Sequence, residues 1–207
     1  MSVLEEMAAL LMKGKAKDVK ALVEQALNDG LEPQKILTEG LLSGMGVIGE
    51  RFKKNEVYVP EVLIAARAMK AGMEVLQPAL TSTGIEPVGT AVVGTVKGDL
   101  HDIGKNLVCM MLEGAGLRVV DIGIDVAPET FVAAAKENKA QIIGISALLT
   151  TTMTNMKAVV DAVKESGISA KTMIGGAPVT QAFCDEIGAD GYAPDAASAA
   201  DLAVSFL

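Results

Sequence analysis

The sequence predicts an α+α/β protein, in which an N-terminal four-helix bundle forms a cap ahead of a doubly wound parallel sheet. Two observations carry this prediction. Residues 1–80 place apolar side chains at the three- and four-residue spacing of amphipathic helices. From residue 89, short β-branched runs alternate with helix-length segments. We therefore expect domains at 1–80 and 89–207, joined by a linker at 81–88.

Turn and cap residues divide the N-terminal part into about four helices. Val19 and Val23 lie on one apolar stripe, and that segment closes at Gly30, where a helix C-cap favours glycine. Pro33 opens the next segment and Pro60 opens a long one, because the first turn of a helix tolerates a missing N–H. Short loops between these segments are typical of a small bundle.

The linker is predicted from breaker residues. Pro78 is expected to end the long helix, and the polar stretch 81–84 and Pro87 follow it. We regard 78–88 as a hinge between the two parts of the chain.

In the second part the alternation of elements is regular. The predicted strands are 90–96, 117–123, 141–146 and 171–176. The predicted helices are 102–115, 128–138, 152–166, 178–187 and 195–206. Strict alternation predicts parallel strands with helices on both faces. In a flavodoxin-like or Rossmann-like sheet the first and third strands are neighbours at the point where strand order reverses, and ligands bind there, beyond the carboxyl ends of the strands.

Charge and composition exclude several classes of function. The net charge is −8 and the longest basic run is Lys53-Lys54, which argues against nucleic-acid binding. No apolar stretch approaches the roughly 18 residues of a membrane span, and the N-terminus is acidic rather than basic, so we expect a cytoplasmic protein. Cys109 and Cys184 belong to no metal or redox motif and are predicted to be buried, reduced thiols.

The only histidine, His101, follows the first predicted strand, between Asp99 and Asp102. Its imidazole can offer one nitrogen to a metal or an electrophile while Asp99 accepts the other ring N–H and fixes the tautomer. Gly104, three residues on, would let the backbone pass close to a bulky ligand. A lone histidine is more often a surface or core residue, so this loop alone does not establish a site.

Two further loops are expected at the same edge of the sheet. Hydroxyl residues Ser146, Thr150 and Thr152 follow the third strand, and the pair Gly175-Gly176 ends the fourth. The hydroxyls suit an uncharged polar ligand, and the glycines leave room for a flat or extended one. The alternatives are a helix N-cap and an ordinary turn. Dinucleotide binding is disfavoured because no GxGxxG follows the first strand, and a zinc site is disfavoured because the cysteines lack spacing.

Taken together, the three loops have a recognisable spacing. Asp-x-His-x-x-Gly at 99–104 is followed after 41 residues by Ser-x-Leu at 146–148 and after a further 26 by Gly-Gly at 175–176. This order resembles the cobalamin-binding signature of B12-dependent methyltransferases and mutases. The segments 44–52 and 57–69 resemble the helical cap that precedes this module in methionine synthase. As a free-standing pair of units, the chain most resembles the corrinoid proteins of methanol-, methylamine- and methoxyarene-type methyltransferase systems.

The resemblance implies a role for each matching residue. His101 would displace the cofactor's own base and bind cobalt from the lower face, an arrangement called base-off/His-on. Asp99 would hydrogen-bond His101, and Thr152 stands where methionine synthase has the serine that completes this relay. Tyr58, Val59 and Val62 of the cap would face the upper side of the corrin. The implied cofactor-binding residues are Asp99, His101, Asp102, Ile103, Gly104, Ser146, Leu148, Thr150, Thr152, Gly175, Gly176, Gly191 and Tyr192.

The same resemblance implies a methyl carrier rather than an enzyme in its own right. Cobalamin would alternate between methylcobalamin and its Co(I) form as the carrier shuttles between two enzymes. One would be a substrate-specific methyltransferase, and the other would pass the methyl group to tetrahydrofolate or a thiol. A reductive activator of Co(II) would be a further partner. The sequence leaves the methyl donor open.

Two alternatives stay open beside the carrier. A cobalamin-dependent sensor or regulator also pairs a helical bundle with a B12 domain, but it usually carries a DNA-binding or signalling domain, and none is recognisable here. The small subunit of an adenosylcobalamin mutase would supply the same histidine loop, but such subunits generally lack a counterpart of residues 1–80.

Overall fold

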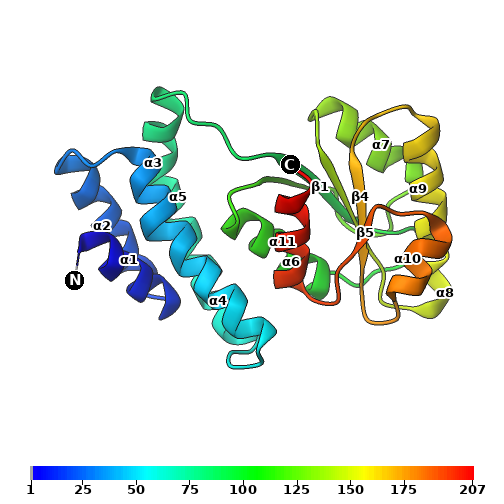
Figure 1. The fold of residues 1–207 in the computed structure, drawn as a ribbon, viewed down its shortest axis with the longest axis horizontal. Helices are drawn as coiled ribbons and strands as arrows, with labels where there is room; N and C mark the ends of the chain where they lie inside the picture. The colour runs from blue at the N-terminus through cyan, green and yellow to red at the C-terminus, as the bar shows by residue number, and fades with distance from the viewer. Residues whose placement is uncertain (1) are drawn as a thin grey trace. The chain divides into compact units, whose positions relative to one another are not determined.

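A computed structural model describes residues 2–207, and the chain divides between Pro87 and Val88 into two compact units (Figure 1). The first unit is helical, as predicted. Its elements are α1 (Val3–Met12), α2 (Ala16–Asn28), α3 (Pro33–Lys35), the π-helix η1 (Ile36–Leu42), α4 (Ser43–Lys53) and α5 (Val59–Ser82). Because α3, η1 and α4 follow one another without a break, they form one composite helix, and the unit is a four-helix bundle.

Close helix packing in the bundle rests partly on small residues. Gly72 of α5 lies where a Cβ would come within 2.9 Å of Leu41 and 3.2 Å of Val19. Gly40 likewise leaves room for the Met7 side chain of α1. These glycines let helices approach one another more closely than larger side chains would allow.

The prediction that Pro78 ends the long helix is wrong. Helix α5 continues through Pro78 to Ser82. Its last turn is supported by side-chain hydroxyls, since Thr81 Oγ1 donates to the Gln77 carbonyl at 3.0 Å and Ser82 Oγ donates to the Ala79 carbonyl at 2.9 Å. Both hydroxyl bonds lie at the end of the helix beyond Pro78, which itself lacks the N–H for one backbone hydrogen bond. The stretch between α5 and the first strand is therefore 83–89, shorter than the predicted hinge.

The second unit is a five-stranded, wholly parallel sheet in the order β2-β1-β3-β4-β5. The strands are β1 (Thr90–Thr95), β2 (Arg118–Asp121), β3 (Ile142–Ser146), β4 (Lys171–Gly175) and β5 (Gly191–Tyr192). The neighbouring positions of β1 and β3 confirm the predicted reversal of strand order. The short edge strand β5 was not predicted as a strand.

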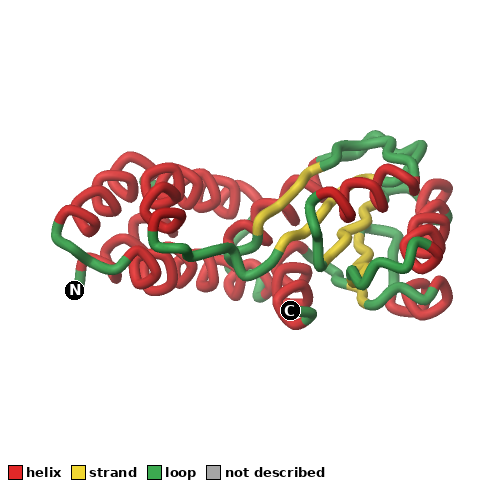
Figure 2. The backbone as a smooth tube through the Cα atoms, turned by 90° about the horizontal axis from the view of Figure 1, so that it is seen from above, coloured by secondary structure: helices red, strands yellow, loops and turns green. Residues whose placement is uncertain are grey.

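Helices cover both faces of the sheet (Figures 1 and 2). They are α6 (Ile103–Gly114), α7 (Pro128–Glu137), α8 (Thr150–Met153), α9 (Asn155–Glu165), α10 (Gln181–Ile187) and α11 (Ala196–Ser205). Helices α6 and α11 pack on one face, while α7, α9 and α10 pack on the other. On that second face, fully buried Phe131 of α7 fills the space left by Gly94 in β1.

The strand register brings the predicted loops to one edge. Thr95, Ser146 and Gly175 are paired across β1, β3 and β4, so the loops that follow these three strands start at the same level. Parallel strands therefore deliver the His101 loop, the Ser/Thr loop and the Gly-Gly loop to the carboxyl edge of the sheet, as the sequence predicts.

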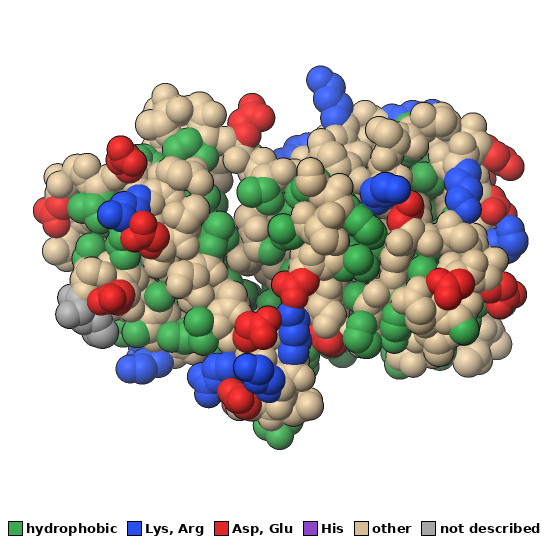
Figure 3. All heavy atoms as spheres, viewed as in Figure 1, with side chains coloured by type: hydrophobic (Ala, Val, Ile, Leu, Met, Phe, Trp, Pro, Cys, Tyr) green, Lys and Arg blue, Asp and Glu red, His purple; other side chains and the backbone are tan. Residues whose placement is uncertain are grey.

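Other sequence expectations can be compared with the surface and the core. Cys109 and Cys184 are both buried and free, which confirms that prediction. Burial, and next the charge of Asp121, raises the pKa of Cys109 to about 12, so this thiol is protonated near neutral pH. On the face shown in Figure 3, the acidic and basic side chains of the α/β unit are interspersed. None of the helices formed by residues 2–207 combines the length and apolar character that crossing a membrane requires.

Candidate cofactor site

A tight turn after β1 delivers Asp99 into the protein. The Asp99 N–H donates to the Val96 carbonyl at 3.1 Å, and Gly98 at the turn has φ = +82°. A positive φ at this position of a turn favours glycine, which explains Gly98 in the sequence. The turn buries the Asp99 side chain completely, while His101, two residues later, has 48% of its side chain exposed.

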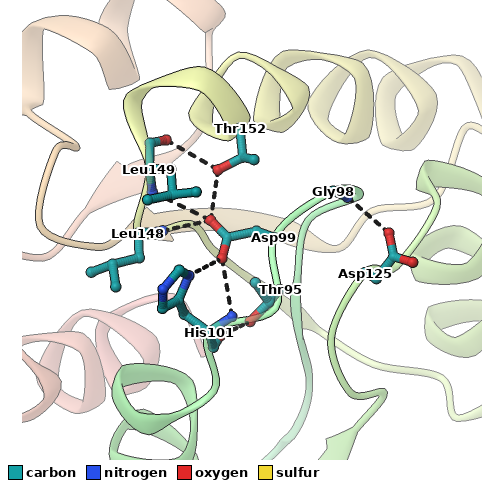
Figure 4. A network of polar contacts seen from close by, with 8 residues as sticks. All are labelled: Thr95, Gly98, Asp99, His101, Asp125, Leu148, Leu149 and Thr152. Atoms are coloured by element: carbon teal, nitrogen blue, oxygen red, sulfur yellow. Dashed lines mark hydrogen bonds and ion pairs between the residues drawn. The ribbon is translucent and has the colours of Figure 1, made fainter.

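Both carboxylate oxygens of Asp99 accept several hydrogen bonds (Figure 4). Oδ1 accepts from the backbone N–H of His101 at 3.1 Å and lies 2.7 Å from Nδ1 of the His101 ring. Oδ2 accepts from the N–H groups of Leu148 and Leu149 at 2.8 and 3.3 Å, and from Thr152 Oγ1 at 2.6 Å. One buried carboxylate therefore joins the loop after β1 to the loop after β3.

This network keeps Asp99 ionised. Burial by itself raises the pKa of Asp99, but the hydrogen bonds from Thr152, from the Leu148 N–H and from His101 outweigh it and hold the pKa well below its usual range. An ionised carboxylate can only accept, so Nδ1 of His101 carries the proton in this contact. In the neutral imidazole, Nε2 is then the nitrogen without a proton.

The backbone of His101 is fixed as well. Its N–H is bound to Asp99, and its carbonyl accepts from the hydroxyl of Thr95 at 3.0 Å. Thr95 is fully buried at the end of β1. The backbone N–H and carbonyl of His101 are therefore both held, and so is Nδ1 of its ring. Ring atom Nε2 has no hydrogen-bond partner within the part of the chain that the structure describes. Such a nitrogen is suited to bind a metal.

Large apolar side chains are exposed in the loops that follow β1, β2 and β3 and at the start of α6. We call this set the apolar rim: Leu100, Ile103, Ile124, Leu148 and Leu149. Ile103 is 77% and Leu100 is 68% exposed, although both flank the histidine within two residues. Exposed apolar groups clustered near a free ligand atom are typical of a binding surface for a large, partly apolar molecule.

The structure brings most of the predicted residues to this edge, with different surroundings. Asp102 is exposed and accepts from Asn106 Nδ2 at 3.2 Å. Thr150 is exposed at the start of α8, and Ser146 is half-buried at the end of β3. Gly104, in the first turn of α6, has open space where a Cβ would project.

The remaining predicted glycines border the protein's own atoms. Gly176 has φ = +132°, and a Cβ there would collide with the Ala147 carbonyl. At Gly175 a Cβ would approach the Ala193 carbonyl to 3.1 Å. Gly191 lies under α11, where a Cβ would meet Leu202 and Phe206. Internal packing is thus a sufficient reason for these glycines, whatever the ligand requires.

Tyr192 and the cap residues have contrasting exposures. Tyr192 is half-buried against the core of the α/β unit. In the helical unit, Tyr58 is 64% exposed and caps the N-terminus of α5, whereas Val62 is fully buried. Val59 is half-buried. Of the three predicted cap contacts, Tyr58 is thus the most accessible.

Several residues near the histidine loop were not predicted from the sequence. Thr95 holds the His101 carbonyl, as described above. Asp125, in the loop after β2, accepts from the Gly98 N–H at 2.8 Å. Lys105 of α6 is buried, forms an ion pair with Asp121 and donates to Asn106 Oδ1 at 2.7 Å. A polar residue inside an apolar pattern was the available signal for Thr95 and Lys105, but Asp125 resembles an ordinary turn residue.

Comparison with known protein families agrees with this geometry. Residues 89–201 match a family model described as a B12 binding domain, and residues 3–77 match a second model with the same description. The chain belongs to the B12-binding corrinoid proteins. The resemblance found from the motif spacing is thereby confirmed, and the cofactor class is a corrinoid.

Similar proteins share both units. A corrinoid protein of Desulfitobacterium hafniense (strain Y51) is 41% identical over all of this chain and 98% of its own length. Trimethylamine corrinoid protein 1 of Methanosarcina acetivorans is 48% identical over 84% of this chain and 83% of its own. A chain in the crystal structure of the methanol:cobalamin methyltransferase complex of Methanosarcina barkeri superposes with a TM-score of 0.86, at 32% identity, over 98% of this chain and 78% of that chain.

The donor set of the site fits a corrinoid. Among residues 2–207, no group of three or more His, Cys, Asp or Glu side chains is arranged to hold a metal ion. The site instead offers a single oriented nitrogen, His101 Nε2, on a loop whose neighbouring residues Leu100 and Ile103 expose apolar side chains. One axial ligand suffices for a metal that arrives inside a macrocycle, as with haem iron.

Proposed function

We propose that this chain is a methyl carrier that binds cobalamin with His101 as the lower axial ligand. The observation that carries the proposal is the orientation of the sole histidine. Nδ1 is fixed 2.7 Å from a buried, ionised Asp99, which leaves Nε2 free to bind a ligand. When bound, the corrinoid supplies a cobalt that accepts a methyl group from one enzyme and yields it to another.

The chain's own residues would perform four tasks. Asp99 keeps the imidazole in one tautomer and one orientation, as carboxylates behind histidine ligands do. Thr152 and the Leu148 N–H hold Asp99 ionised, so its carboxylate stays a hydrogen-bond acceptor for the imidazole. The apolar rim would cover the lower corrin face and keep water from the histidine. Gly104 would leave space for the cofactor where a side chain would project.

The partners follow from the similar proteins. Their names associate them with trimethylamine and with a methanol:cobalamin methyltransferase complex. We therefore propose that a methyltransferase specific for a methylamine or for methanol charges this carrier, and that a second methyltransferase discharges it to tetrahydrofolate or a thiol. A reductive activator would return oxidised cobalt to the cycle. Full-length similarity to a corrinoid protein with the same two units favours a carrier over a sensor or a mutase subunit.

Spectroscopy of the loaded protein tests axial ligation. Apo-protein is mixed with hydroxocobalamin and desalted, and the cobalt is reduced to Co(II) for electron paramagnetic resonance. Because the chain has one histidine, 15N-histidine labels a single ring. We expect the axial nitrogen splitting of the wild type to change from a triplet to a doublet on labelling, and we expect the label to have no effect on the spectrum of His101→Ala, in which only the cofactor's own base could supply the axial nitrogen. If the wild type retains the corrinoid but its axial nitrogen splitting is the same with and without 15N-histidine, the assignment of His101 as the ligand is wrong.

Methyl transfer is tested separately. The loaded protein is incubated, under reducing conditions, with purified trimethylamine-specific or methanol-specific methyltransferase and the matching substrate. We expect one of the two pairs to change the cobalt absorption of the wild type faster than that of His101→Ala. If neither enzyme, nor a monomethylamine- or dimethylamine-specific one, methylates a correctly loaded protein, the assigned substrate class is wrong.

A further inference from the structure

Outside the His–Asp–Thr network, a second carboxylate holds the turn that carries Asp99. Asp125 lies in the loop after β2 and has φ = +55°, a left-handed conformation that Asp adopts more readily than most residues. Its Oδ1 accepts from the Gly98 N–H at 2.8 Å, and its own N–H donates to the Asp99 carbonyl at 3.0 Å. Asp125 therefore binds the chain on both sides of the Gly98–Asp99 peptide, and Figure 4 shows the contact with Gly98.

The left-handed conformation of Asp125 allows its carboxylate to reach the Gly98 N–H while its own N–H reaches the Asp99 carbonyl. Around it, the Val126 N–H donates to the Thr95 carbonyl and the Thr95 N–H donates to the Gly123 carbonyl, each at 3.0 Å. Segment 123–126 thus runs beside the end of β1 like a short additional strand. The neighbours of Asp125 in this segment bind the end of β1, whereas Asp125 itself binds the turn that follows β1.

A lysine completes the contact. Lys97 Nζ lies 3.2 Å from Oδ1 and 3.3 Å from Oδ2 of Asp125, and both side chains are partly exposed. The hydrogen bond from Gly98, together with Lys97, holds the pKa of Asp125 below its ordinary value, so this group is ionised near neutral pH. On another side of the turn, Asn155 Nδ2 donates to the Lys97 carbonyl at 2.7 Å. The turn is thus held by Asp125 in the loop after β2 and by Asn155 at the start of α9.

The position of this turn determines where Asp99 Oδ1 lies. Gly98 has a positive φ and no side chain, so its own conformational preferences fix the turn only weakly. A shift of a few tenths of an ångström at Gly98 would alter the 2.7 Å contact between Asp99 Oδ1 and His101 Nδ1. Hydrogen bonds weaken steeply with poor geometry, so the orienting effect of Asp99 depends on what holds the turn.

We propose that Asp125 is a positioning residue for the cofactor site, which acts through the Gly98–Asp99 turn to keep the His101 ring in one tautomer and one orientation. The proposal deepens the proposed function and rests on it for the role of His101 in binding cobalt. The relation between Asp125, Asp99 and the His101 ring can nevertheless be tested in the protein without cofactor.

Two substitutions separate the carboxylate from the backbone conformation. Asp125→Gly adopts the left-handed conformation without strain but removes the acceptor. Asp125→Asn keeps an acceptor oxygen and also tolerates this conformation, but it loses the charge that pairs with Lys97. The matched control is Asp190→Ala. Asp190 likewise accepts a backbone N–H, from Thr172 at 2.8 Å, and pairs with Lys171, but at the opposite edge of the sheet.

The first measurement uses the full chain without cofactor. Nitrogen NMR of the 15N-labelled single histidine reports which ring nitrogen carries the proton. We expect the wild type, Asp125→Asn and Asp190→Ala to show mainly the form protonated on Nδ1. In Asp125→Gly we expect that preference to be lost, with both neutral tautomers visible. Circular dichroism confirms that each variant is folded.

The second measurement uses hydroxocobalamin as the probe. We expect Asp125→Gly to bind it about tenfold more weakly than the wild type, at the low end of the effects seen when partners of metal ligands are removed. Asp125→Asn should restore most of the affinity, and the axial nitrogen splitting of the reduced cobalt should weaken in the glycine variant alone.

Each result decides one question. An unchanged tautomer in folded Asp125→Gly overturns the positioning role, and so does an equal loss in Asp125→Asn or Asp190→Ala. If the wild type fails to bind hydroxocobalamin, the proposed function is wrong, while the NMR comparison still decides whether Asp125 orients the ring. Loss of the tautomer preference in the glycine variant together with rescue by asparagine supports the proposal.

Discussion

Two glycine-containing loops at the same edge of the sheet serve different purposes. The loop after β1 leads to Gly104, where a Cβ would meet nothing within 4 Å. The loop after β4 contains Gly176, where a Cβ would collide with the Ala147 carbonyl. From the sequence alone both glycines were expected to make room for a ligand. In the structure only Gly104 has free space, whereas the space beside Gly176 is filled by the loop after β3.

The difference shows how the fold supports the site. The Ala147 carbonyl can approach Gly176 only because no side chain intervenes, and Ala147 directly precedes Leu148, whose N–H binds Asp99. Gly176 thus helps set the position of the loop that orients Asp99. Gly104 borders the surface that the cofactor would cover. Substitution of Gly176 should therefore change the stability of the fold, whereas substitution of Gly104 should change the binding of the cofactor.

The largest effect is expected at Gly176. Gly176→Ala should lower the free energy of unfolding by about 4 kcal/mol or more, because it combines a forbidden backbone conformation with a collision against backbone. Urea unfolding measures the change. Gly123→Ala is the matched control, since Gly123 has φ = +87° but open space around it. It should cost only about 1–2 kcal/mol. Equal losses in the two variants would mean that the contact with Ala147 is unimportant.

Asp99 should give the next largest effect, with a defined pH dependence. Asp99→Asn should lower the free energy of unfolding at pH 7 by about 1.5–3 kcal/mol, because hydrogen bonds to a charged acceptor are lost. The folded-state pKa lies below the unfolded value of about 3.9, so the carboxylate stabilises the fold fully above that pH. This stabilisation is lost as the pH falls below about 4, towards the folded-state pKa.

Urea unfolding at pH 7, 5 and 3 checks the sign. The wild type should lose more stability between pH 5 and pH 3 than Asp99→Asn does, so the two curves should converge at low pH. Parallel curves would show that the ionised state of Asp99 contributes nothing to the fold, and that its role is confined to the histidine.

Gly104 should show the opposite pattern to Gly176. Because Gly104 lies in the first turn of α6 with free space around it, Gly104→Ala should stabilise the apo-protein by up to about 1 kcal/mol. The same change should weaken hydroxocobalamin binding, and Gly104→Leu should weaken it further. Equilibrium dialysis measures affinity and urea unfolding measures stability. If both variants bind the corrinoid as the wild type does, Gly104 does not border the cofactor.

The sequence predicted those features that depend on local pattern. β-Branched runs gave β1 to β4, and the alternation with helices gave the parallel sheet and the position of the edge that carries the site. The His101 loop was found because its residue types and spacing are unusual. Strand β5 was missed because two residues are too few to show a period. Pro78 was misjudged because hydroxyls in the following turn support the helix beyond it.

What the sequence could not show are contacts made between distant segments. Asp125 acts on Gly98 across 27 residues, and Thr152 acts on Asp99 across 53. Thr152 was found only because its place in the motif resembles that of a known serine, and Asp125 has no such counterpart. Likewise, the collision that demands glycine at 176 depends on a backbone atom from another loop. Tertiary contacts of this kind can be found only from the three-dimensional structure.

The smallest effect is expected for Thr152→Ser, which tests whether the extra methyl group of the threonine matters. Thr152 Oγ1 donates to Asp99 Oδ2 at 2.6 Å, so the hydroxyl is already placed as a serine hydroxyl would be. Thr152→Ser should change the unfolding free energy by less than about 1 kcal/mol and leave corrinoid binding unchanged. Thr152→Val, which keeps the shape but removes the donor, should cost about 1.5–3 kcal/mol, because a hydrogen bond to an ionised carboxylate is lost. A serine variant as impaired as the valine variant would mean that the methyl group, rather than the hydroxyl, positions Asp99.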